Sequence, residues 1–162
     1  MGKFTVSVSI NSSQQDVFDF LGNAANFQRW MPHMQSATWT SSGEPGVGST
    51  GRGVMKMAGR EMELMLEITR WDAPGLLGFK ILNVPFPLEA TEYVYSLQPE
   101  DGGTRLTLDG EIEMVRFLRF ATGWMGKMYV KSNGHELNSV KQLLEAGLHG
   151  CNRIEYRDQA TH

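Results

Sequence analysis

The segment YVYSLQPEDGGTRLTL, residues 93–108, predicts a β-hairpin whose register can be worked out from the sequence. Residues 101–102, Asp-Gly, are typical of a two-residue type I′ turn, which joins antiparallel strands with the twist they favour. Around this turn each apolar residue meets an apolar or small partner on one face, and polar residues meet on the other. The inward pairs are Leu97–Leu106, Tyr95–Leu108 and Tyr93–Gly110.

A second hairpin predicts the same two-faced sheet. A turn at residues 58–59 places Met55 opposite Met62 on the inner face and Lys56 opposite Glu61 on the outer face. The alternation continues along the second strand, whose inner residues are Met62, Leu64, Leu66 and Ile68. By the same parity Arg70 points inward near the end of this strand.

Strand and helix signals outside the hairpins complete the element order. Seven strands are expected, at residues 4–10, 34–40, 48–57, 60–71, 76–82, 89–98 and 104–114. Two short helices follow the first strand, one after the capping residues Ser12 and Ser13 and one near residues 25–30. Because sequential strands joined by short turns are antiparallel, the pattern predicts an α+β fold with one antiparallel sheet.

A long helix at residues 121–148 provides the cover that the apolar face needs. Its apolar stripe consists of Leu137, Val140, Leu144 and Leu148, with Met125, Met128 and Tyr129 extending it towards the N-terminus. We therefore expect the sheet to wrap round this helix.

Composition predicts one globular domain, residues 1–150, followed by a polar and mobile tail at 151–162. Of the 162 residues 41% are hydrophobic and 20% charged, which excludes wholesale disorder. The net charge of −3 predicts no basic field for nucleic acid or anionic lipid. No apolar run is long enough for stable membrane insertion. The single cysteine, Cys151, fits a reducing cytoplasm.

Three stretches give the chain a family resemblance. They are FTVSVSI at 4–10 leading into DVFDFL at 16–21, NFQRWMP at 26–32, and YSLQPEDGGTRL at 95–106. Over residues 3–148 the chain resembles the START-like (SRPBCC) superfamily, which includes the birch pollen allergen and bacterial polyketide cyclase/dehydrase proteins. The resemblance implies a helix-grip fold: a curved seven-stranded antiparallel sheet round a long C-terminal helix. It also implies an internal cavity for a lipid-like or polycyclic ligand, and it implies no particular reaction.

No motif in the sequence predicts a metal, a cofactor or a catalytic residue. The four histidines, His33, His135, His149 and His162, lack metal-ligand spacing, and no phosphate-binding loop or serine-nucleophile motif is present. No acid–base pair can be assigned to the inner face. His33 belongs either at the cavity mouth or on the plain surface.

The candidate ligand-binding residues are those that parity or helix position turns towards the cavity. They are Met55, Met57, Met62, Leu64, Leu66, Arg70, Tyr93, Tyr95, Leu108, Met125 and Met128. Methionine suits an adaptable apolar wall, although a solid Met-rich core remains the alternative. The tyrosines either pack or bond a ligand. Arg70 either reaches solvent at the rim or meets an anion, because a buried unpaired arginine is too costly.

Two functions of different class follow, with a third behind them. The first is a non-catalytic carrier or sensor of a small hydrophobic molecule. The second is a polyketide cyclase or dehydratase, in which Tyr93, Tyr95, Arg70 or His33 would polarise a carbonyl or move a proton. The third is a protein partner that binds through the loops at the cavity mouth. Because no acid–base pair is apparent, the sequence favours the carrier.

Overall fold

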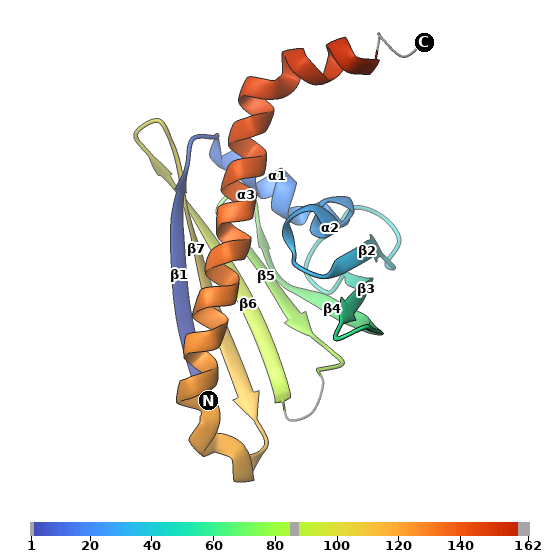
Figure 1. Cartoon of the computed structure of the whole chain (residues 1–162), viewed down its shortest axis with the longest axis vertical. Coiled ribbons are helices and arrows are strands. Elements are labelled where there is room, and N and C mark those ends of the chain that lie inside the picture. The colour runs from blue at the N-terminus through green and yellow to red at the C-terminus, as the bar shows by residue number, and fades with distance from the viewer. Residues whose placement is uncertain (1, 85–87, 159–162) are drawn as a thin grey trace.

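The computed structural model of the chain describes residues 2–84 and 88–158. Its elements follow the predicted order: one strand, short helices, further strands and one long helix (Figure 1). They are β1 (Gly2–Ile10), α1 (Gln14–Gly22), η1 (Ala24–Asn26), α2 (Phe27–Trp30), β2 (Met34–Trp39), β3 (Thr50–Met57), β4 (Arg60–Asp72), β5 (Leu76–Ile81), β6 (Leu88–Glu100), β7 (Gly103–Met114), η2 (Arg116–Ala121) and α3 (Thr122–Asp158).

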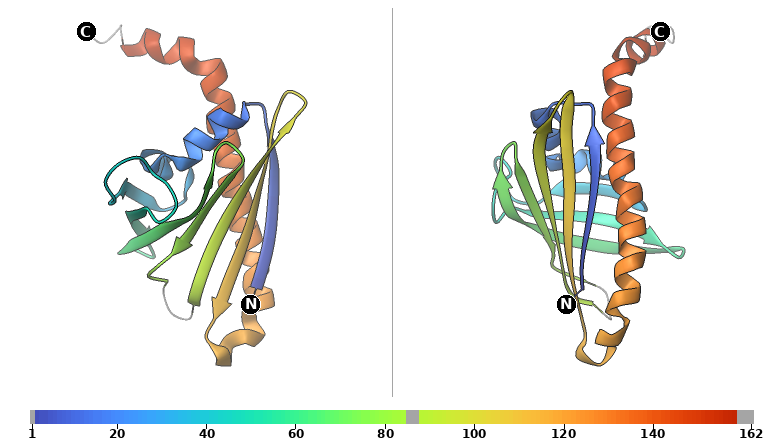
Figure 2. Two further views of the ribbon diagram at one scale, coloured as in Figure 1. Left: turned by 180° about the vertical axis from the view of Figure 1, so that it is seen from behind. Right: turned by 90° about the vertical axis from the view of Figure 1, so that its left-hand side faces the viewer.

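The strands form one antiparallel sheet of seven, in the order β1-β7-β6-β5-β4-β3-β2. The sheet is strongly curved, so that β3 and β4 run across the direction of β1 and β7 (Figure 2). Helix α3 lies on one side of the sheet, next to β1 (Figure 1). This arrangement is the predicted helix-grip fold, and we call the sheet face on the α3 side the inner face.

The registers of both hairpins are confirmed. Tyr95 pairs with Leu108 in the β6–β7 hairpin, and Met55 pairs with Met62 in the β3–β4 hairpin. The turn at 58–59 has positive φ at both residues, as a type I′ turn requires. The turn at 101–102 has positive φ only at its glycine, so the predicted type I′ conformation is wrong there, although the register is unchanged.

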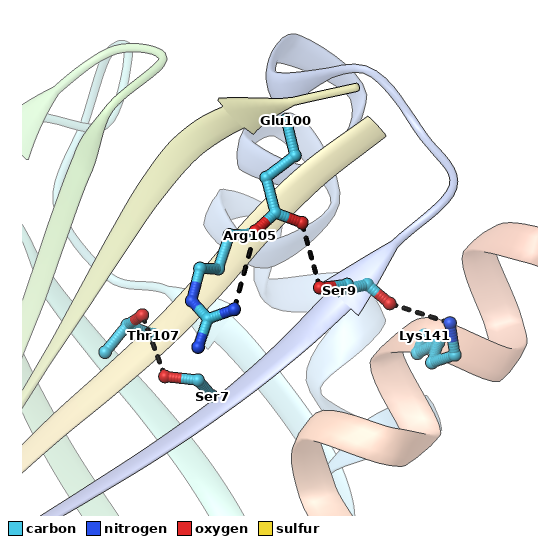
Figure 3. A network of polar contacts seen from close by, with 6 residues as sticks. All are labelled: Ser7, Ser9, Glu100, Arg105, Thr107 and Lys141. Carbon is cyan, nitrogen blue, oxygen red and sulfur yellow. Dashed lines mark hydrogen bonds and ion pairs between the residues drawn. The ribbon is translucent and has the colours of Figure 1, made fainter. Parts of the chain in front are cut away.

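Polar side chains bind the edge strand β1 to the β6–β7 hairpin (Figure 3). The Ser9 hydroxyl donates to Glu100 Oε2 at 2.9 Å, and Arg105 pairs with Glu100 Oε1 at 3.5 Å. The hydroxyls of Ser7 and Thr107 lie 3.0 Å apart. These contacts reinforce the backbone pairing of β1 with β7.

Helix α3 is held along β1 by burial and by two polar contacts. Leu137 and Val140 are fully buried against the sheet. Lys141 Nζ donates to the Ser9 carbonyl oxygen at 2.7 Å (Figure 3), and the Asn11 backbone N–H donates to Glu145 Oε1 at 3.0 Å. Since Ser9 and Asn11 lie at the end of β1, both contacts tie α3 to the same edge of the sheet.

The C-terminal end of the long helix differs from the prediction. The sequence pattern ends the long helix at residue 148 and assigns 151–162 to a polar tail. Helix α3 instead continues to Asp158, and residues 159–162 lie outside the described part of the chain.

Candidate functional site

The inner face of β6 carries the polar groups of the candidate site. Thr91, Tyr93, Tyr95 and Leu97 alternate to this face, because successive side chains of a strand point to opposite sides. Thr91 and Tyr95 are buried and Tyr93 is partly buried. Thr91, Tyr93 and Tyr95 therefore form a line of polar side chains within an otherwise apolar face, and we call this line the polar row.

Five aromatic side chains, which we call the aromatic wall, enclose one end of this row. Tyr95 meets Trp30 and Phe79 edge to face, each with ring centroids 6.1 Å apart. Phe27 contacts Trp30 at 5.8 Å and Phe79 at 5.7 Å, and Trp39 stacks on Phe79 at 6.3 Å. Edge-to-face packing of this kind holds each ring in place. Helix α2 and strands β2, β5 and β6 all contribute to it.

Gly110 in β7 makes room for the Phe4 ring, which packs against Tyr129 of α3. A Cβ atom at Gly110 would lie 2.1 Å from the ring of Phe4, so only glycine fits beneath that ring. Phe4 in turn stacks on Tyr129 of α3 with centroids 5.9 Å apart and meets Tyr93 edge to face at 6.2 Å. Phe4 therefore links β1, β6 and α3 beside Tyr93, the middle residue of the polar row.

Glu136 of α3 adds a carboxyl group to the site. Burial raises the pKa of Glu136 to about 7, and its charge contributes to the raised pKa of both Tyr93 and Tyr95. Glu136 therefore faces the polar row of β6. Glu136 is partly buried and has no hydrogen-bond or ion-pair partner among the described residues, so its removal from water alone accounts for the raised pKa.

The neighbouring phenols are strong candidates for hydrogen-bond donors. Burial, and to a smaller extent the charge of Glu136, raises the pKa of Tyr93 and Tyr95 well above the ordinary value. Burial also raises the pKa of Tyr129. All three hydroxyls therefore keep their protons at neutral pH, next to a carboxyl group that titrates near neutrality.

Two buried polar atoms near this row have no partner among the described residues. They are the indole N–H of Trp30 and the hydroxyl of Thr91. An unpaired buried donor costs about 1–3 kcal/mol of stability. A ligand or water that bonded either atom would recover part of that free energy, which is a reason to look for a ligand here.

Met55, Met62 and Leu64 of β3 and β4 form a part of the inner face that we call the methionine end. Its side chains are more exposed to solvent than those of the aromatic wall. Met55 and Leu64 are partly buried and pack against the core, while Met62 is 37% exposed. These neighbours come from β3 and β4, which cross the direction of the rest of the sheet. Two of the predicted methionines thus stand together with an apolar surface open to solvent.

The remaining predicted apolar residues fall into different environments. Leu66 and Leu108 are buried in the core, and Met125 is partly buried against it. Met128 is 49% exposed and therefore stands apart from the inner face. Met57 lies in β3, and its side chain is outside the described part of the structure.

The predicted inward direction of Arg70 is wrong. The pairing of β4 with β5 shifts between Ile68 and Arg70, which is a β-bulge. A Cβ atom built on Gly78 would meet both Thr69 and Arg70, so these two consecutive side chains share the outer face. A bulge adds one residue and reverses the parity after it. Arg70 is accordingly exposed on the face opposite the site.

The same bulge turns Trp71 inward, where it packs on Phe18 of α1 with centroids 5.0 Å apart. Beside this contact lies an open surface cleft of about 250 Å³. It is lined by Phe18, Asp19, Gly22, Asn23, Trp39, Glu44, Pro45 and Trp71. None of the predicted ligand-binding residues lines this cleft, and it adjoins the aromatic wall only through Trp39.

Within the described ranges, no group of three histidine, cysteine or acidic side chains is placed to hold a metal ion. His33 is exposed at a positive φ of 69° immediately before β2. No helix in the described part of the chain is long and apolar enough to cross a bilayer.

Glu136 is the main site residue that the sequence analysis missed, and a weak signal for it was present. It lies seven residues after Tyr129 and four before Val140, a spacing that places all three on one helical face. A carboxylate at the edge of an apolar stripe usually reaches solvent, which made this signal easy to pass over.

Comparison with known proteins agrees with this fold. The profile of the family described as "Polyketide cyclase / dehydrase and lipid transport" matches residues 1–145. No curated protein matches the chain.

Several solved structures are similar in fold. A START superfamily protein from Mycobacterium smegmatis superposes with a TM-score of 0.74 at 12% identity, covering 90% of this chain and 98% of that one. Ara h 8.0201 gives 0.72 at 14% identity, with 89% and 97% covered. The di-domain ARO/CYC StfQ from the steffimycin biosynthetic pathway gives 0.76 at 11% identity, with 91% of this chain but 51% of that chain covered. At these identities the likeness shows the fold alone.

Proposed function

The chain belongs to the polyketide cyclase/dehydrase and lipid transport family, and on this premise we propose that it binds a small hydrophobic molecule at the inner face of its sheet. The observation that carries the proposal is the polar row of β6, with the Glu136 carboxyl group opposite it, inside an otherwise apolar layer. Such a combination of apolar wall and a few convergent polar groups is typical of ligand sites.

The ligand's apolar body contacts the methionine end of the site, and its polar end approaches β6. Met55, Met62 and Leu64 offer an adaptable apolar surface. A ligand hydroxyl or ketone accepts a hydrogen bond from Tyr93 or Tyr95, which remain protonated. The proposed wall comprises Met55, Met57, Met62, Leu64, Leu66, Leu108 and Met125, and Arg70 and Met128 are left out.

Binding is tested by a matched pair of substitutions on one strand. Met62 and Met65 lie on opposite faces of β4 and are 37% and 43% exposed. We expect Met62→Trp to weaken saturable binding of an apolar fluorescent dye and Met65→Trp to leave it unchanged. Native mass spectrometry of gently purified protein should reveal a co-purifying apolar molecule. Equal effects of the two substitutions, or no saturable binding at all, would contradict the proposal.

A cyclase is the second candidate function, and the Glu136 pKa of about 7 favours it. A carboxyl group with this pKa is suited to general acid–base catalysis at neutral pH. The Glu136 carboxylate would take a proton from the methylene between two ketones, and the resulting enolate carbon would attack a third carbonyl carbon. The Tyr95 phenol would donate a proton to the new alkoxide and regain one from the protonated Glu136 carboxyl group, which restores both residues. In this second proposal Glu136 of α3 is the acid–base group that the sequence did not assign.

Two substitutions separate carrier from enzyme. If the protein only binds, Tyr95→Phe should lower affinity by about 0.5–1.5 kcal/mol, the net value of one neutral hydrogen bond. If it is a cyclase, Glu136→Gln should slow conversion of a poly-β-ketone thioester by roughly 10²–10⁴-fold and leave binding nearly unchanged. An unmodified thioester after incubation with wild-type protein would exclude that cyclase reaction.

A further inference from the structure

The helical segment η2 and the start of α3 form the end of the molecule beyond the end of the sheet (Figure 1). Several large apolar side chains of this end are exposed. Phe120 is 85% exposed, Trp124 is 70% exposed, and Met128 is exposed to nearly half its surface. Phe117 of η2 is also exposed. Large apolar side chains gathered in this way mark an interaction surface.

Two lysines share the helical face that carries Trp124 and Met128. Trp124, Lys127, Met128 and Lys131 follow the spacing i, i+3, i+4, i+7, so they form one stripe on α3. All four are exposed. Met125, by contrast, is partly buried against the core, so the stripe faces away from the sheet. We call Phe120, Trp124, Lys127, Met128 and Lys131 the basic-aromatic patch.

The charge of this end is opposite to that of the whole chain. Residues 115–135 contain Arg116, Arg119, Lys127 and Lys131 and no aspartate or glutamate, whereas the full chain has a net charge of −3. Among the described residues neither Lys127 nor Lys131 forms an ion pair. This end therefore carries a local cationic surface although the chain as a whole is acidic. The expectation that no basic field exists, which was drawn from the net charge, is incomplete for this end.

We infer that the basic-aromatic patch docks on the surface of an anionic lipid bilayer. Tryptophan and phenylalanine favour the boundary between headgroups and acyl chains, and lysines beside them attract anionic headgroups. A second copy of the chain is a poorer occupant, because a symmetric contact would bring Lys127 and Lys131 of one copy against the same two lysines of the other. The acidic remainder of the chain is repelled by the bilayer, so docking is restricted to this end.

The basic-aromatic patch is separate from the proposed ligand site, because its side chains face away from the inner face. The two surfaces nevertheless lie on one helix, since α3 carries both Trp124 and Glu136. Docking would bring the start of α3 to a source of hydrophobic molecules while the rest of the domain stays in water.

The test is flotation of the full chain with vesicles of phosphatidylcholine alone and of equimolar phosphatidylcholine and phosphatidylglycerol. We expect binding to the anionic vesicles only, weakened by salt because the attraction is electrostatic. Lys127→Glu with Lys131→Glu should lower the partition coefficient roughly tenfold or more. Lys56→Glu with Arg60→Glu, two exposed cations of the β3–β4 hairpin, is the matched control and should have little effect.

Tryptophan fluorescence tests whether Trp124 of the basic-aromatic patch enters the bilayer. Trp124 is far more exposed than Trp30, which is buried, or Trp39 and Trp71, which are partly buried. We expect anionic vesicles to shift the emission to the blue, and Trp124→Phe to remove that shift while thermal unfolding stays unchanged. Equal binding to both vesicle types, or equal loss in the control pair, would overturn the inference. So would a dimer in solution that Trp124→Ser dissociates.

Discussion

Glu136 binds its proton more tightly in the folded chain than in the unfolded one. Its ordinary pKa of 4.5 rises to about 7 because folding removes the carboxyl group from water. The groups that face it, Tyr93 and Tyr95, stay neutral because burial raises the pKa of each phenol. The folded state therefore holds one more proton than the unfolded state between about pH 4.5 and pH 7.

This difference fixes the sign of a pH effect on stability. As pH rises from about 4.5 to about 7, the free energy of unfolding should fall by up to roughly 3 kcal/mol through Glu136, and above pH 7 this contribution should be constant. Glutamine does not titrate, so the free energy of unfolding of Glu136→Gln relative to that of wild type should increase across that range. Urea denaturation at several pH values measures it.

Glu61→Gln is the matched control, because Glu61 is exposed at the β3–β4 hairpin. The free energy of unfolding of Glu61→Gln should change with pH in the same way as that of wild type. If that of Glu136→Gln also changes in this way, then Glu136 does not hold the extra proton and its proposed role in acid–base chemistry fails with it.

At the scale of elements, one glycine decides how α3 meets the sheet. Gly110 of β7 leaves room for the Phe4 ring, which stacks on Tyr129. Phe4 is only 5% exposed and is also packed against Tyr93, so the ring has little freedom to move aside. Strands β1 and β7 and helix α3 therefore share one tightly packed point.

Gly110→Ala should overpack this point. The added methyl group would lie 2.1 Å from ring atoms of Phe4, and we expect a loss of about 1–3 kcal/mol in the free energy of unfolding. Gly147→Ala is the control: a Cβ there meets nothing within 4 Å, and alanine should stabilise α3 by about 0.5–1 kcal/mol. Chemical denaturation compares the two. A neutral Gly110→Ala would mean that β1 and α3 shift together to admit the methyl group.

At the scale of the whole molecule, α3 and the sheet share one hydrophobic core. Leu137 of α3 is buried in the same cluster as Leu106 and Leu108 of β7 and the aromatic wall. Neither the helix stripe nor the sheet's inner face is covered without the other. We therefore expect the domain to unfold as one cooperative unit.

Leu137→Ala tests whether α3 and the sheet unfold together. It should cost about 2–5 kcal/mol, because a large buried side chain is lost and a cavity remains. The far-ultraviolet signal and the near-ultraviolet signal of the aromatic wall should shift to the same lower denaturant concentration. Gln142→Ala, at an exposed position of α3, should change stability by less than about 0.5 kcal/mol. Separate transitions for the two signals would mean that α3 and the sheet unfold independently.

The sequence by itself determined the element order, the hairpin registers and the inward direction of Tyr93 and Tyr95. These features depend on contacts between residues close in the chain, and a period-two pattern around a short turn allows only one register to bury the apolar set. The Met55–Met62 pair was predictable for the same reason.

Only the tertiary structure decided the position of Arg70, the role of Glu136 and the exposure of Trp124. A bulge changes parity without changing composition, so the pattern around Arg70 cannot reveal it. Glu136 and Trp124 lie on one amphipathic helix, and helical spacing states which residues share a face but not where that face meets the sheet. The placement of α3 along β1, set by contacts between residues far apart in the chain, partly buries Glu136 and leaves Trp124 in solvent.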